Sequence, residues 1–111
     1  MSKTNLVPVP GKRVAVLARE DARLSPFAAL GLHEADAHVI RHADGIVDER
    51  VIRSLALSQN LFETEGIIVL DLEGDVRAGV EKIKASASIP RTDSVRGFAY
   101  EAGSGALHEV A

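Results

Sequence analysis

Three short and mostly apolar runs are spaced along the chain, at residues 14–18 (VAVLA), 37–41 (AHVIR) and 66–72 (GIIVLDL). Apolar runs of this length are typical of strands covered on both faces, as in a parallel sheet. We therefore expect three neighbouring strands in these segments.

Between these runs the apolar residues follow a helical spacing. Ser25 and Pro26 predict a helix start before residues 27–35, because Ser can cap a helix and Pro fits its first position. After Asp48 the apolar residues recur at near-helical intervals and predict a second helix, with Val51, Ile52, Leu55, Leu57 and Leu61. Residues 76–85 predict a third helix, with one apolar face made of Val76, Val80 and Ile83.

The last part of the chain predicts a β-hairpin, because segments 98–101 (FAYE) and 106–110 (ALHEV) flank a Gly-Ser-Gly turn. Strands that alternate with helices predict an α/β fold: a single domain with a central, mostly parallel β-sheet flanked by helices and an antiparallel C-terminal hairpin at the edge. Residues 1–13 contain Pro8, Pro10 and Gly11, and we expect an extended N-terminal arm there, followed by the domain at residues 14–111.

Composition narrows the class of protein. The chain has 111 residues, enough for one domain, and its 4% of aromatic residues predict an aliphatic core. A net charge of -3 argues against general binding to nucleic acid or anionic membranes. With no cysteine, no signal-peptide pattern and no membrane-spanning run, we expect a cytoplasmic protein without disulfides or thiolate sites.

Several segments, taken together and in order, resemble the β-class carbonic anhydrases, especially their compact bacterial branch. Residues 18–24 (AREDARL) are similar to the family pattern A-C-M-D-A-R-L, and residues 35–45 (ADAHVIRHADG) are similar to G-D-A-H-V-I-R-N-A-G-G. The segment VIRSLALS and the closing RGFAYEAGSGALHEV also resemble their family counterparts. The resemblance covers most of the chain and implies the same fold, in a shortened form.

The resemblance also implies a zinc site that this sequence lacks. The family binds catalytic zinc with two cysteines and a histidine, and these positions correspond to Arg19, Leu72 and Asp75 here. A guanidinium stays protonated and repels a cation. We therefore expect no zinc, no other cofactor and no zinc-dependent hydration of carbon dioxide.

Asp21 and Arg23 match the family's Asp-Arg dyad, which by itself is an ion pair and not a catalyst. Two interpretations of Arg19 remain open. Together with Arg23 it could bind a small anionic ligand bidentately, or it could pair with Glu20, Asp21 or Asp75 and fill the former zinc site.

Other polar residues give weaker signals. Asp71, Glu73 and Asp75 supply the oxygen ligands that hard cations use, but their spacing matches no complete loop signature, and we interpret them as a solvated acidic turn. His38 and His42 share one face of a strand, and without a third ligand we interpret them as packed or surface histidines.

Two functions compete. The first is a non-catalytic binding or assembly homologue that forms a homodimer or higher homo-oligomer, as the family does through its sheet edge and N-terminal arm. The second is a metal-independent enzyme, of a lyase or related type, that acts on a small anionic or carbonyl substrate in the old pocket. A true carbonic anhydrase with displaced ligands is disfavoured by the absence of cysteine.

Overall fold

The computed structural model describes residues 13–19, 30, 37–42, 47–100 and 107–111. The predicted N-terminal arm, the helix predicted at residues 27–35 and the Gly-Ser-Gly turn lie outside the described residues, apart from Arg13 and Leu30. Leu30 has a helical backbone and is buried.

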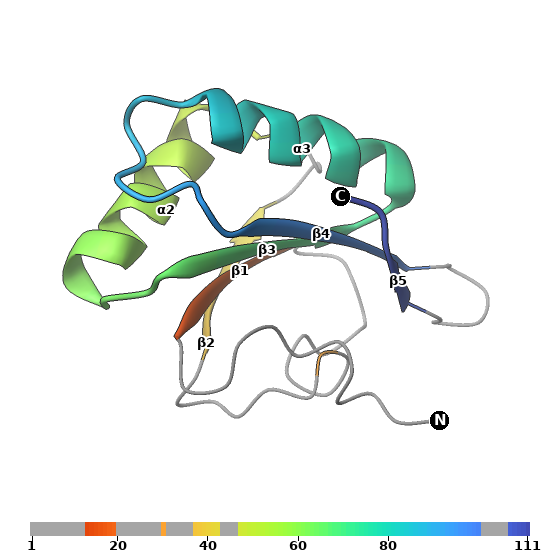
Figure 1. The fold of residues 1–111 in the computed structure, drawn as a ribbon, viewed down its shortest axis with the longest axis horizontal. Coiled ribbons are helices and arrows are strands. Elements are labelled where there is room, and N and C mark those ends of the chain that lie inside the picture. Colours follow the sequence, from red (N-terminus) through yellow and green to blue (C-terminus); the bar gives the residue numbers. More distant parts are fainter. Residues whose placement is uncertain (1–12, 20–29, 31–36, 43–46, 101–106) are drawn as a thin grey trace.

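The five strands form one sheet in the order β2-β1-β3-β4-β5 (Figure 1). The first four run parallel to their neighbours, and the last pairs antiparallel with β4. Their bounds are β1 (Val14–Arg19), β2 (Ala37–His42), β3 (Gly66–Asp71), β4 (Val95–Tyr100) and β5 (Leu107–Glu109). The predicted α/β class, with its mostly parallel sheet and antiparallel hairpin at the edge, is confirmed.

Two long helices connect the strands, α2 (Glu49–Leu61) and α3 (Glu73–Ala85). Helix α2 begins where the sequence predicts, because the Asp48 side chain caps it by accepting a hydrogen bond of 3.0 Å from the Val51 N–H. Its C-terminal cap is Phe62, and the next residue, Glu63, has a left-handed backbone (φ 58°) that stops the helix.

Helix α3 begins three residues earlier than the predicted 76–85, so residues 73–75 are its first turn and not a loop. An acidic residue such as Asp75 is favourable there, because the amino end of a helix carries partial positive charge. The interpretation of residues 71–75 as a solvated acidic turn is therefore wrong. Asp71 is also the last residue of β3 and is buried.

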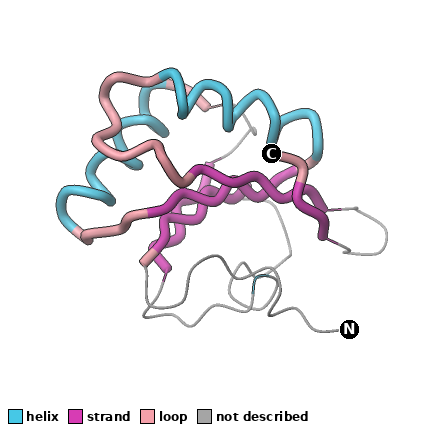
Figure 2. The backbone as a smooth tube through the Cα atoms, in the orientation of Figure 1, coloured by secondary structure: helices cyan, strands magenta, loops and turns pink. Residues whose placement is uncertain are grey.

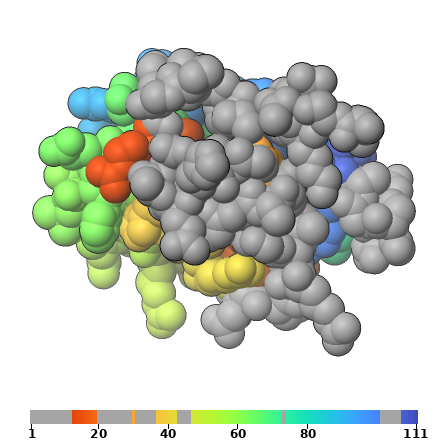
Figure 3. All heavy atoms as spheres, turned by 90° about the horizontal axis from the view of Figure 1, so that it is seen from below, coloured from red at the N-terminus to blue at the C-terminus, as the bar shows by residue number. Residues whose placement is uncertain are grey.

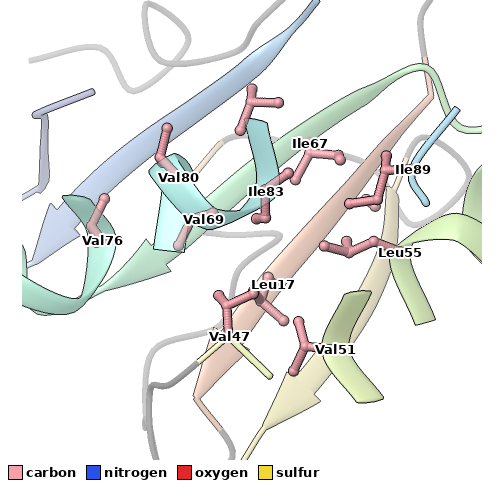
Figure 4. Close-up of a cluster of buried hydrophobic side chains, with 12 residues drawn as sticks. Leu17, Val47, Val51, Leu55, Ile67, Val69, Val76, Val80, Ile83 and Ile89 are labelled. Atoms are coloured by element: carbon pink, nitrogen blue, oxygen red, sulfur yellow. The ribbon is translucent and has the colours of Figure 1, made fainter. Parts of the chain in front are cut away.

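Both helices cover the same face of the sheet (Figures 1 and 2). Alternate strand residues such as Leu17 and Val69 point toward the helices and join a cluster with Leu55, Val80 and Ile83 (Figure 4). The opposite set forms a second cluster on the other face, made of Val14, Val16, Leu30, Ile68, Leu70 and Phe98. This double burial explains why the parallel strands are continuously apolar instead of alternating.

Side-chain contacts join β4 and β5, in addition to the backbone hydrogen bonds between the two strands. Arg96 donates two hydrogen bonds, of 2.7 and 2.8 Å, to the carboxylate of Glu109, and its guanidinium lies 5.1 Å from the ring centre of Phe98. This contact lowers the pKa of the Glu109 carboxyl, because the hydrogen bonds from Arg96 favour its ionised form. The short strand β5 is thereby held on the edge of the sheet.

Candidate functional site

Three polar side chains meet at the carboxyl ends of β1, β2 and β3. Arg19, His42 and Asp71 are the last residues of their strands, and the parallel register places Arg19 beside His42. Two residues earlier, Leu17, Ile40 and Val69 belong to the cluster under the helices. Side chains two residues apart on a strand point to the same face. Arg19, His42 and Asp71 therefore lie on the face of the sheet that the helices cover.

Arg19 lies between two carboxylates. Its Nη1 atom is 3.8 Å from Oδ1 of Asp71 and 3.9 Å from Oδ2 of Asp75, which lies in the first turn of α3. The Arg19 side chain is 22% exposed, whereas that of Asp71 is 1% exposed. Of the partners that the sequence left open for Arg19, Asp75 is one that the structure places in contact, whereas Glu20 and Asp21 lie outside the described residues. Asp71 is an additional partner that the sequence did not indicate.

The two carboxylate oxygens of Asp71 have different environments. Its Oδ1 atom accepts a hydrogen bond of 2.7 Å from the Leu72 N–H. Its buried Oδ2 atom has no hydrogen-bond partner among the described residues and lies 3.7 Å from Nε2 of His42. Burial raises the pKa of the Asp71 carboxyl, and the Leu72 N–H and the Arg19 charge oppose that rise without cancelling it.

The topology makes this end of the sheet a natural binding place. From β1 the chain goes to β2 on one side and then returns past β1 to β3 on its other side. Open α/β sheets bind their ligands at such a switch point, outside the carboxyl ends of the strands. Arg19 and Asp71 end the two strands on either side of it.

Of the other predicted site residues, Asp75 and Leu72 lie in the described part of the chain, and Asp75 contacts Arg19. Asp21 and Arg23 lie outside the described residues, so the dyad and the part of Arg23 in an anion site stay predictions. Leu72 is the N-terminal cap residue of α3, and its side chain is 40% exposed. Its side chain has no donor or acceptor atom, so Leu72 contributes to the cluster only through its backbone N–H, which donates to Asp71.

The two histidines of β2 have separate roles. Nδ1 of His38 is 2.8 Å from Oγ of Ser58, and its ring lies 4.4 Å from the ring of Phe62 at the end of α2. His42 lies at the other end of the strand and is 8% exposed. Both fit the interpretation as packed or surface histidines, since His38 is partly buried and His42 is buried, but the position of His42 beside Asp71 was missed. The alternation along β2 and the parallel order of the strands contained that signal.

No family model matches the chain. Among curated proteins it is similar to beta-carbonic anhydrase 1 of Mycobacterium tuberculosis and of Mycobacterium bovis, with 32% identity over 136 aligned positions, which span 91% of this chain and 83% of each relative. The chain belongs to the β-carbonic anhydrase family. An alignment of 136 positions exceeds the 111 residues of this chain, so this member is shortened internally relative to those proteins.

Part of the chain is also similar to carbon disulfide hydrolase from Saccharolobus solfataricus, with 42% identity over 59 residues. That match spans 53% of this chain and 29% of the hydrolase. It concerns a segment and not the whole relative.

Solved structures agree with the family. The carbonic anhydrase from Streptococcus mutans superposes with a TM-score of 0.78 at 27% identity, over 95% of this chain and 87% of that chain. The carbonic anhydrase from Glaciozyma antarctica superposes with a TM-score of 0.80 at 28% identity, over 100% of this chain and 89% of that chain. The fold of this shortened member is thus that of the family.

Of the three positions that the sequence resemblance assigns to the zinc ligands, Arg19 and Leu72 do not fit the ion. A zinc ligand needs a lone pair on nitrogen, oxygen or sulfur. Arg19 has a protonated guanidinium that two carboxylates already contact, and Leu72 has no ligand atom. Within the described part of the chain, no group of three or more potential ligand side chains is arranged to hold a metal ion.

Proposed function

We propose that this chain is a zinc-independent, non-catalytic member of the β-carbonic anhydrase family that retains the fold for binding or assembly. The observation that carries the proposal is the contact of the Arg19 guanidinium with both Asp71 and Asp75. In this arrangement an organic cation at the end of β1 offsets part of the negative charge of Asp71, at the end of β3, and of Asp75, in the first turn of α3. A protonated side chain thus occupies the place proposed for a metal ligand.

The consequence for the family chemistry follows from the pKa of water. Bound zinc lowers that pKa from about 15.7 to about 7 and so supplies hydroxide at neutral pH. None of the side chains around Arg19 supplies this nucleophile. Hydration of carbon dioxide should therefore proceed no faster than in buffer.

Assembly is a use of the fold that needs no zinc, and we expect a homodimer or a higher homo-oligomer in the cytoplasm. A small domain has a limited core, and pairing buries apolar surface that a monomer leaves in water. Support for assembly comes from exposed apolar side chains on α2 and at its C-terminal cap, which include Leu57, Leu61 and Phe62.

Metal analysis and a hydration assay test the loss of zinc. We expect the protein purified from zinc-supplemented cells to contain well under one zinc ion per chain and to give no turnover in stopped-flow hydration of carbon dioxide. Stoichiometric zinc with turnover would refute the proposal.

A matched variant tests the assignment of the three positions. Combined Arg19→Cys, Leu72→His and Asp75→Cys substitutions supply the family's ligand types, and we expect this variant to gain zinc that wild type does not bind. If neither protein binds zinc, the three positions are not the former ligand positions.

A second candidate function is a metal-independent enzyme that acts on a small anionic or carbonyl substrate. It is favoured by the buried Asp71 carboxyl, with its raised pKa, beside His42 at the switch point. Arg19, with Arg23, would hold the substrate, and Asp71 or His42 would move a proton. The partial similarity to carbon disulfide hydrolases suggests one assay, the release of sulfide from carbon disulfide by zinc-free protein. Turnover by wild type that is lost in Asp71→Asn would favour this function over the non-catalytic one.

A further inference from the structure

We draw no further inference here: the strongest candidate, the exposed apolar surface that Leu57, Leu61 and Phe62 form at the C-terminal end of α2 (green in Figure 3), carries none, because nothing in the described residues shows what covers it.

Discussion

Asp71 is the residue on which the site depends most. It ends β3, contacts Arg19, and has one carboxyl oxygen buried near His42 without a hydrogen-bond partner among the described residues. A buried carboxylate with incomplete hydrogen bonding is unfavourable unless it is protonated or paired. Arg19 supplies part of this pairing at a distance too long for a strong hydrogen bond.

The raised pKa of Asp71 predicts a pH dependence of stability. The folded state holds this proton more tightly than the unfolded chain, whose carboxyl has a pKa near 3.8. Stability from this group is therefore fully present below that pH and is lost as the pH rises through the folded-state pKa, with a slope of at most about 1.4 kcal/mol per pH unit. Urea unfolding from pH 4 to 7 should show the free energy of unfolding of wild type falling relative to Asp71→Asn.

The control for this experiment is Asp93→Asn, which changes an exposed aspartate. Its free energy of unfolding should run parallel to that of wild type across the same range. If the Asp71→Asn curve is also parallel to wild type, the carboxyl of Asp71 titrates normally and the account of its burial is wrong.

At the scale of elements, the contact between α3 and β4 depends on a glycine. A Cβ atom built on Gly97 would overlap Cγ1 of Val76 and would lie 3.0 Å from Cγ2 of Val80. Both valines belong to the buried face of α3. The helix therefore packs against β4 at a distance that a larger residue does not allow.

We expect Gly97→Ala to lower the free energy of unfolding by about 1–3 kcal/mol, because the core must shift to admit the methyl group. Gly74→Ala is the matched control, since nothing lies within 4 Å of a Cβ at that position in the first turn of α3. That control should be neutral or stabilising by up to about 1 kcal/mol, because Ala favours helix more than Gly. Urea denaturation of both variants measures the difference, and equal effects would contradict the close packing.

At the scale of the whole molecule, stability should be independent of metal. The sheet is covered by α2 and α3 on one face and carries a second buried cluster on the other, and neither cluster contains a metal-ligand side chain. No helix in the described residues is long and apolar enough to cross a membrane. The fold described here is thus held by aliphatic burial and the strand ladder.

Chelator or added zinc should therefore leave the melting temperature of wild type unchanged to within about 1 °C, because a ligand stabilises only a protein that binds it. Zinc at a hundred times its dissociation constant would contribute about 2.7 kcal/mol, which corresponds to a shift of several degrees. The variant with Cys at 19 and 75 and His at 72 is expected to show that shift in differential scanning calorimetry. A comparable shift in wild type would contradict zinc independence.

The sequence alone determined the fold class and most of the elements that the structure describes. Continuous apolar runs predicted β1 and β3, and the helical spacing after Asp48 predicted α2. The alternating pattern at the end of the chain predicted the hairpin. Each of these signals depends only on residues close together in the sequence. The missing cysteines and Arg19 are also visible in the sequence, together with the family resemblance. The pairing of Arg19 with Asp75 was one of several alternatives that these local facts left open.

Only the tertiary structure decided the environment of Asp71. Its burial, its distance of 3.7 Å from His42 and its contact with Arg19 depend on the parallel register of strands that are far apart in the chain. The start of α3 at Glu73 is likewise decided by the way the helix follows β3 and covers the sheet. The sequence shows which charged residues are present. The pKa of a carboxyl, however, is set by its burial and its neighbours, and both are defined only once the chain has folded.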